Sequence, residues 1–175
     1  MDIERIEEMR LTAKDETQIG SLLDSAFGTD FAGRSYYQQR HHVRLLVREA
    51  DKIIGHVAID LRAIRMGDAI VQVAGLAEVA TATSHRGQGL ASSLLDAAIL
   101  EVRQTASTFL LLFGDHPIYA RKGFMPKQNI LRYTSFVGVK SGVTIEAQKD
   151  GLMVLLLSDL SWDDDAMIDL VGHAF

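Results

Sequence analysis

The segment from Leu76 to Ala91, LAEVATATSHRGQGLA, decides the fold, because an apolar strand runs through a glycine-bearing turn directly into a helix. Residues before Ala82 are rich in Val, Leu and Ala, whereas apolar residues after Gly89 recur at helical spacing. The first amides of a helix lack an intrahelical partner and lie at the positive end of its dipole. The turn therefore predicts an anion site, to which glycines give close access and Arg86 a charge-assisted contact.

Two common phosphate-binding motifs do not fit this turn. A P-loop needs Lys and then Ser or Thr after its last glycine, whereas Leu90 follows Gly89. The dinucleotide fingerprint needs a third small residue where Ser92 stands, and it opens a first βαβ unit, whereas this turn follows a series of hairpins. A turn that holds no ligand remains the alternative at this point.

Composition places the chain among globular proteins. Its 175 residues are 47% hydrophobic and 23% charged, which suits one domain spanning residues 1–175. The chain has no cysteine, which excludes disulfides, thiolate metal sites and a cysteine nucleophile. A net charge of −5 disfavours nucleic acid as a partner and suits a cationic small molecule. The charged start MDIERIEEMR and the absence of a long apolar run predict a cytoplasmic protein without a membrane partner.

Periodicity predicts an α/β (α+β) fold with a mixed, mostly antiparallel central sheet flanked by helices. The predicted strands are 8–13, 43–49, 52–64, 69–82, 109–113, 130–137 and 151–157. The predicted helices are 15–27, ending at Gly28, then one from Gly89 and one at 117–122, ending at Gly123. We expect a loop with a short helix at 29–42 and a last helical turn at Asp163–Asp165.

Three segments, in this order, resemble the GCN5-related N-acetyltransferase (GNAT) superfamily. Arg86-x-x-Gly89-x-Ala91 is similar to the loop with which this superfamily binds the pyrophosphate of acetyl-CoA. Val79-Ala80-Thr81 matches the strand whose backbone pairs with the pantetheine arm, as an added strand would. Tyr119-Ala-Arg-Lys-Gly123-Phe124 resembles the superfamily's Y-x-x-x-G-F segment.

The resemblance implies acetyl-CoA as cosubstrate and no metal. The residues it assigns to acetyl-CoA are Val79, Ala80, Thr81, Arg86, Gly87, Gln88, Gly89, Leu90 and Ala91. Within the superfamily, the chain looks most similar to the aminoglycoside 2'-N-acetyltransferases and other small bacterial acetyltransferases. It departs from them at Ser35, where that group has a substrate-contacting aspartate, and in its ending His173-Ala174-Phe175. His41 and His42 are adjacent, not four residues apart, and so do not predict a metal site.

Acetyl transfer to an amine needs a proton acceptor and a group that protonates the departing thiolate. Glu78, in the strand just before the pantetheine segment, is the candidate base, although the glutamate of the aminoglycoside enzymes aligns more nearly with Ala77. The resemblance makes Tyr119 the candidate acid. His116 is an alternative base, and a polar strand residue is the alternative reading of Glu78.

The irregular segment before the hairpins is the predicted acceptor wall. The resemblance assigns it Asp30, Phe31, Tyr36 and Tyr37, an acidic residue with aromatics that suits a cationic amine. Asp163–Asp165 is a solvated run or, alternatively, a second acceptor contact. The sequence thus predicts an N-acetyltransferase for a small amine, with an aminoglycoside-like cation as one option. Acetylation of protein N-termini or lysines, an acyl-CoA-binding sensor and a homodimer all stay open.

Overall fold

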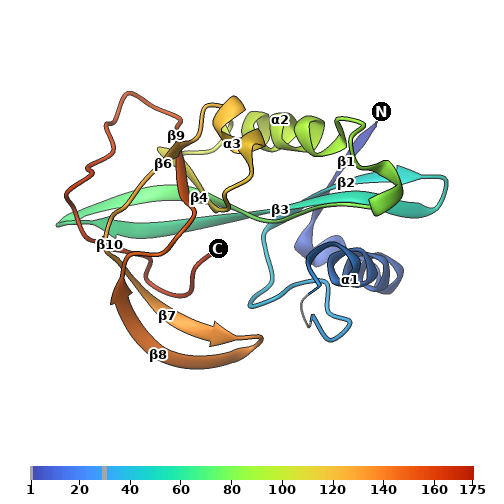
Figure 1. The fold of residues 1–175 in the computed structure, drawn as a ribbon, viewed down its shortest axis with the longest axis horizontal. Coiled ribbons are helices and arrows are strands. Elements are labelled where there is room, and N and C mark those ends of the chain that lie inside the picture. Colours follow the sequence, from blue (N-terminus) through green and yellow to red (C-terminus); the bar gives the residue numbers. More distant parts are fainter. Residues whose placement is uncertain (1, 29–30) are drawn as a thin grey trace.

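The computed structural model describes residues 2–28 and 31–175, and these form one twisted sheet with helices on both faces (Figure 1). The helices are α1 (Ala13–Phe27), α2 (Leu90–Val102) and α3 (Pro117–Arg121), with short 3₁₀ turns at Glu8–Arg10 and Thr83–His85. The strands are β1 (Ile3–Glu7), β2 (Val43–Glu49), β3 (Lys52–Met66), β4 (Ala69–Thr81), β5 (Phe109–Phe113), β6 (Met125–Pro126), β7 (Leu131–Val137), β8 (Lys140–Ala147), β9 (Leu152–Leu156) and β10 (Ile168–Asp169).

The sheet runs in the order β6-β9-β5-β4-β3-β10-β7-β8, and β2 pairs with both β1 and β3. Nearly all pairs are antiparallel, and the parallel ones are β4 with β5 and β10 with β7. The predicted mixed, mostly antiparallel sheet is confirmed, as are the hairpin series β2–β3–β4 and the helices α1, α2 and α3.

The helices cover opposite faces of the sheet, α2 and α3 above it and α1 below it in Figure 1. Alternate residues of β2 serve the two faces, because Leu45 packs in the core with α2 and Leu46 packs in the core with α1. The β7–β8 hairpin curls away from the sheet on the side of α1, and the C-terminal end lies between that hairpin and α1 (Figure 1). Three parts of the chain, α1, the β7–β8 hairpin and the C-terminal end, therefore lie on the same side of the sheet (Figure 1).

The most consequential feature of the sheet is the short pairing of its two central parallel strands. β4 pairs with β5 from Val73 to Gly75, and there the ladder ends. β4 continues to Thr81, still paired with β3 on its other side. Among the described residues, no strand pairs with this edge of β4 from Leu76 onward, at the end that leads into α2.

Three expectations differ from the structure, and four strands, β1, β6, β8 and β10, were not predicted. Residues 8–13 are a 3₁₀ turn and the start of α1, because Thr12 and Asp15 form a reciprocal capping box that begins the helix. Within the described part of 29–42 there is no helix. Asp163–Asp165 does not open a helical turn; residues 164–166 form a bend, in which the Asp163 carboxylate accepts the amides of Asp165 and Ala166.

Among the described residues, no helix has the length and apolar character needed to cross a membrane.

Candidate active site

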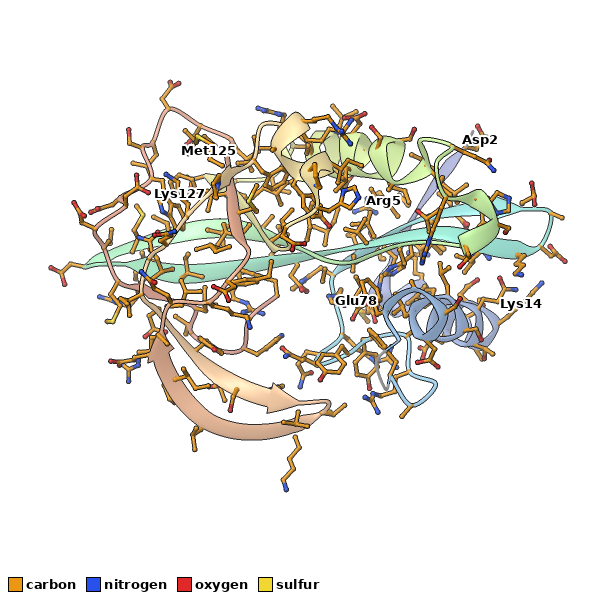
Figure 2. All side chains as sticks on the ribbon, viewed as in Figure 1. Asp2, Arg5, Lys14, Glu78, Met125 and Lys127 are labelled. Atoms are coloured by element: carbon orange, nitrogen blue, oxygen red, sulfur yellow. The ribbon has the colours of Figure 1, made fainter. Side chains whose placement is uncertain are left out.

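Glu78 sits at a β-bulge in the middle of β4. Ala77 pairs with Ala58 and Ala80 pairs with His56, so Glu78 and Val79 together oppose Val57. Glu78 has a φ of +56°, a conformation that non-glycine residues seldom adopt and that costs free energy unless the surroundings hold it. The bulge directs the Glu78 side chain to the face of the sheet that α1 covers (Figure 2).

Hydrogen bonds at both ends of the residue hold Glu78 in place. Its carboxylate accepts the backbone amide of Tyr37 at 2.7 Å and lies 3.2 Å from Arg44 Nη1. Its carbonyl oxygen accepts Nδ1 of His56 at 2.8 Å. Burial first, and then the charge of Arg44, lowers the pKa of His56 to about 3. His56 is therefore neutral, which fits one ring nitrogen donating to Glu78 and the other accepting from Arg44 at 2.9 Å.

Arg44 lies beneath Glu78 and is completely buried. Its guanidinium binds both carboxylate oxygens of Glu8, at 2.7 and 3.1 Å, and donates to the carbonyl of Ser35 at 2.9 Å. A buried guanidinium is tolerated only where acceptors surround it. Arg44 thus fastens the start of the chain and the 31–42 segment to the bulge in β4.

His41 lies between two carboxylates, those of Asp60 and Glu78. Its Nδ1 lies 2.9 Å from Asp60 Oδ2 and its Nε2 lies 3.2 Å from Glu78 Oε2, and all three side chains are buried. Burial alone would lower the pKa of His41, but Asp60 and Glu78 outweigh it and raise the pKa to about 9. The imidazole is therefore charged at neutral pH. Since the ordinary pKa is about 6.5, this ion pair stabilises the fold fully below that pH and loses its effect as the pH rises through about 9.

The pKa values of the two carboxylates, Asp60 and Glu78, are lowered, whereas that of His41 is raised. Burial acts to raise the pKa of Glu78, but His41 first, and then the charge of Arg44, overcome it and hold the pKa below its usual value. The pKa of Asp60 is lowered in the same way, against burial, chiefly by His41. Both groups are carboxylates at neutral pH, so they are better partners for a cation than acceptors of a proton.

These groups form the floor of a cavity of about 340 Å³, which we call the aromatic pocket. Its lining is Phe27, Phe31, Tyr37, Gln38, Gln39, His41, Asp60, Ala77, Glu78, His173, Ala174 and Phe175. Phe31 lies 6.0 Å from Phe27 and 5.5 Å from Tyr37, centroid to centroid, so three rings form one wall. The tail that ends in Phe175 forms another.

Only some of the residues predicted to contact the amine acceptor line the aromatic pocket. Phe31, Tyr37 and Glu78 line the aromatic pocket, and so does Ala77, because the bulge turns two successive residues toward it. Tyr36 is not among the lining residues, and its ring lies 5.0 Å from the guanidinium of Arg40. Asp30 lies outside the described residues. Asp163–Asp165 lies away from this cavity, and Asp164 pairs with Lys127.

A second cavity, which we call the phosphate groove, has a volume of about 870 Å³ and lies on the other side of the bulge. Its lining is Ala26, Phe27, Val79, Ala80, Thr81, His85, Arg86, Gly87, Gly89, Leu90, Ala91, Ser92, His116, Ile118, Tyr119, Arg121 and Lys122. All but one of the residues predicted to bind acetyl-CoA are therefore together. The exception is Gln88, whose side chain donates to the carbonyl of Ser84.

The turn before α2 leaves its helix end open to a ligand. Gly87 and Gly89 have φ values of +77° and +81°, and a Cβ on either would meet no atom within 4 Å. Gly89 is the N-cap of α2, and no side chain of the described residues caps the first turn. Free amides, open space and the neighbouring Arg86 fit an anionic group such as a pyrophosphate.

Tyr119 lies in α3 on the groove side, with its ring packed edge-on against Phe124 at 6.2 Å. Burial, followed by the charge of Asp115, raises the pKa of Tyr119, so its phenol keeps its proton at neutral pH. Gly114 makes room for the ring, because a Cβ there would lie 2.8 Å from Tyr119 Cε2. His116 also lines the groove, but its Nδ1 accepts the amide of Ile118 as the cap of α3.

The two cavities adjoin at the bulge. Glu78 lines the aromatic pocket and Val79, the next residue, lines the phosphate groove, while Phe27 borders both. A donor in the groove and an acceptor in the pocket would therefore meet near the bulge.

A family model described as an acetyltransferase (GNAT) domain matches residues 8–126. The chain belongs to this GNAT family. The predicted superfamily and the predicted enzyme class, an acetyltransferase, are confirmed, whereas the resemblance to the aminoglycoside enzymes is not tested by this match. No curated protein matches the sequence.

Solved GNAT structures share the fold at low identity. The acetyltransferase YhbS from Escherichia coli, in complex with CoA, is 20% identical over 97% of this chain and 88% of its own, with a TM-score of 0.65. A GNAT acetyltransferase from Brucella melitensis, in complex with acetyl-CoA, is 17% identical over 94% of each chain, with a TM-score of 0.60. At these identities the likeness concerns the fold.

Sequence reasoning missed the buried partners of Glu78, namely His41, Arg44 and His56, and also Asp60, which pairs with His41. The available signal was their placement, since Arg44, His56 and Asp60 interrupt the apolar runs of β2 and β3. A charged or polar residue inside a strand buried on both faces needs a partner, and such residues indicate a polar network.

We expect Arg44→Met to lower the free energy of unfolding by about 3 to 5 kcal/mol, because it leaves the carboxylates of Glu8 and Glu78 buried without their cation. Arg40→Met is the matched control. Arg40 also pairs with Glu8 but is exposed, so its loss should cost at most about 1 kcal/mol. Urea unfolding of both variants measures the difference, and equal losses would contradict the central place given to Arg44.

Proposed function

We propose that this GNAT protein transfers an acetyl group from acetyl-CoA to a small amine, by direct attack of the amine on the thioester. The observation that carries the proposal is the pair of cavities that adjoin at the bulge, one suited to phosphates and one lined by carboxylates and aromatic rings. The complexes of the E. coli and B. melitensis proteins with CoA and acetyl-CoA support the choice of donor.

The phosphate groove would hold acetyl-CoA by its two polar parts. Free amides at the start of α2, together with Arg86, would bind the pyrophosphate. The edge of β4 along Val79, Ala80 and Thr81 has no partner strand on the β5 side, so its amides and carbonyls are available to the pantetheine arm. Acetyl-CoA supplies the acetyl group as a thioester.

In the aromatic pocket, Glu78 would orient the amine. An alkylamine with a pKa near 10 is mostly protonated at neutral pH and must lose one proton before its nitrogen can attack. Because the pKa of Glu78 is lowered, we assign this carboxylate to hold the ammonium group of the amine, and the proton of that group leaves to water. The nitrogen then forms the amide bond as the carbon–sulfur bond breaks, and the second proton of the nitrogen is lost.

Tyr119 would protonate the departing sulfur. Its phenol lines the groove and keeps its proton, and the proton that it gives to the thiolate can return from solvent. Atoms balance, since an amine and a thioester give an amide and a thiol.

One assay separates the proposed function from two others, protein acetylation and acyl-CoA sensing. Thiol release from acetyl-CoA is measured with small amines, polyamines, aminoglycosides and peptides with free N-termini or lysines. Turnover with small amines supports the proposal, turnover only with peptides would favour protein acetylation, and binding without any turnover would indicate a sensor.

Replacing Tyr119 by Phe should lower kcat by at least about 100-fold, because the thiolate loses its proton donor, while acetyl-CoA binding persists. Tyr133→Phe, on β7 and outside both cavities, removes the same hydroxyl as a control. Thiol-release kinetics and calorimetric titration of acetyl-CoA give the two readouts. An unchanged kcat in Tyr119→Phe would remove the acid assignment.

Replacing Gly89 by Arg should abolish acetyl-CoA binding, since the new side chain enters the open space at the start of α2. Gly67→Arg is the control for backbone strain, because Gly67 also has a positive φ, +59°, but lies in the β3–β4 turn. Acetyl-CoA should raise the melting temperature of Gly67→Arg and leave that of Gly89→Arg unchanged. The same rise in both variants would show that the phosphate groove is wrongly assigned.

A further inference from the structure

The charges around the aromatic pocket cancel. His41 faces Asp60 from β3 and Glu78 from β4; the half-buried Arg62 lies near Asp60, and the buried Arg44 pairs with both Glu78 and Glu8. His56 and His173 are uncharged near neutral pH, because their pKa values are lowered to about 3 and about 4. With His41 protonated, three cations then face three carboxylates. His42, near Asp60, has an exposed side chain.

This balance limits the charge that an acceptor can bring. Glu78 and Asp60 are already paired with the charged His41. A cation that enters the pocket is therefore repelled by the imidazolium unless His41 loses its proton. Among the lining residues that the structure describes, a second and third charge on the same ligand would find no side-chain carboxylate other than Asp60 and Glu78. Polycations therefore gain little there, since burying an unpaired charge is costly.

Beyond its floor the pocket is small and mostly apolar, with Gln38, Gln39 and His173 as its other polar lining residues. Phe27, Phe31 and Tyr37 form one wall, and the ring of Phe175 lies against the guanidinium of Arg62, at 4.4 Å, on another. Its volume of about 340 Å³ is near the lower limit of the roughly 300 to 1,000 Å³ found for ligand pockets. Such walls bury the body of a ligand rather than hydrogen-bond a sugar.

We infer that the acceptor is a monoamine with an aromatic or aliphatic body, and that His41 sets this preference by excluding polycations such as aminoglycosides and polyamines. This inference rests on the proposed function and names the substrate class of the same site. His41 acts here as a specificity-determining residue, placed by Asp60 and Glu78 beside the position expected for the amine.

The test compares amines of equal length. For the wild-type enzyme, kcat/KM for hexylamine and for 2-phenylethylamine should exceed that for 1,6-diaminohexane by about ten-fold or more, and aminoglycosides should be the poorest acceptors. His41→Gln removes the positive charge and keeps a hydrogen-bonding side chain, so the ratio of hexylamine to 1,6-diaminohexane should fall by about ten-fold.

Two further variants sharpen the comparison. Lys14→Gln makes the same change of charge on the exposed surface of α1 and should leave the ratio as in the wild type. Phe27→Ala removes an aromatic wall from a partly exposed position and should lower the advantage of 2-phenylethylamine over methylamine. Calorimetric titration of each amine into the enzyme saturated with CoA gives a second readout that needs no turnover.

The outcomes separate the two proposals. A wild-type enzyme that prefers diamines or aminoglycosides overturns the inference while leaving the acetyltransferase proposal intact, and so does an unchanged ratio in a folded His41→Gln variant. If acetyl-CoA binds but no amine is acetylated, the proposed function fails. If His41→Gln does not fold, the wild-type ratio and Phe27→Ala decide the matter.

Discussion

The buried guanidinium of Arg44 is the interaction on which the rest of the site depends. Arg44 is the second residue of β2, between Val43 and Leu45, and its acceptors come from three separate parts of the chain: Glu8, the carbonyl of Ser35 and Glu78. Removing a guanidinium from water without acceptors would cost several kcal/mol, so the folded state must bring all of these groups together. One residue thereby couples the start of the chain, the irregular 31–42 segment and the bulge of β4.

The bulge in turn gives one strand two functions. An extra residue in β4 sends Glu78 toward the aromatic pocket, while Val79, Ala80 and Thr81 still border the phosphate groove. The early end of the β4–β5 ladder leaves the edge of β4 open on the same stretch. The same few residues of β4 hold Glu78 in place and leave the groove accessible. The buried charge of Arg44, which pairs with Glu78, therefore affects where an acyl donor and an amine can meet.

The sequence predicted the parts of the molecule that local patterns determine. The β2–β4 hairpins, α2, α3 and the glycine turn follow from periodicity and turn residues, and the GNAT resemblance located the groove. Contacts between distant residues were not predictable in this way. The 31–42 segment has no regular structure because Arg44 and Glu78 bind its backbone, and the choice between Ala77 and Glu78 was undecided because only the bulge lets both line the pocket. His41 carries no motif, and its partner Asp60 lies 19 residues away.

The central claim is that a buried, charge-balanced network fixes Glu78, and the ionisation of His41 reports on it most directly. NMR titration of the protein with isotopically labelled histidine would follow each ring from pH 5 to 10. We expect His41 to lose its proton near pH 9, held by Asp60 and Glu78, while His56 stays neutral throughout. A His41 that titrates near the ordinary value of about 6.5 would show that the two carboxylates do not hold it, and would contradict the account.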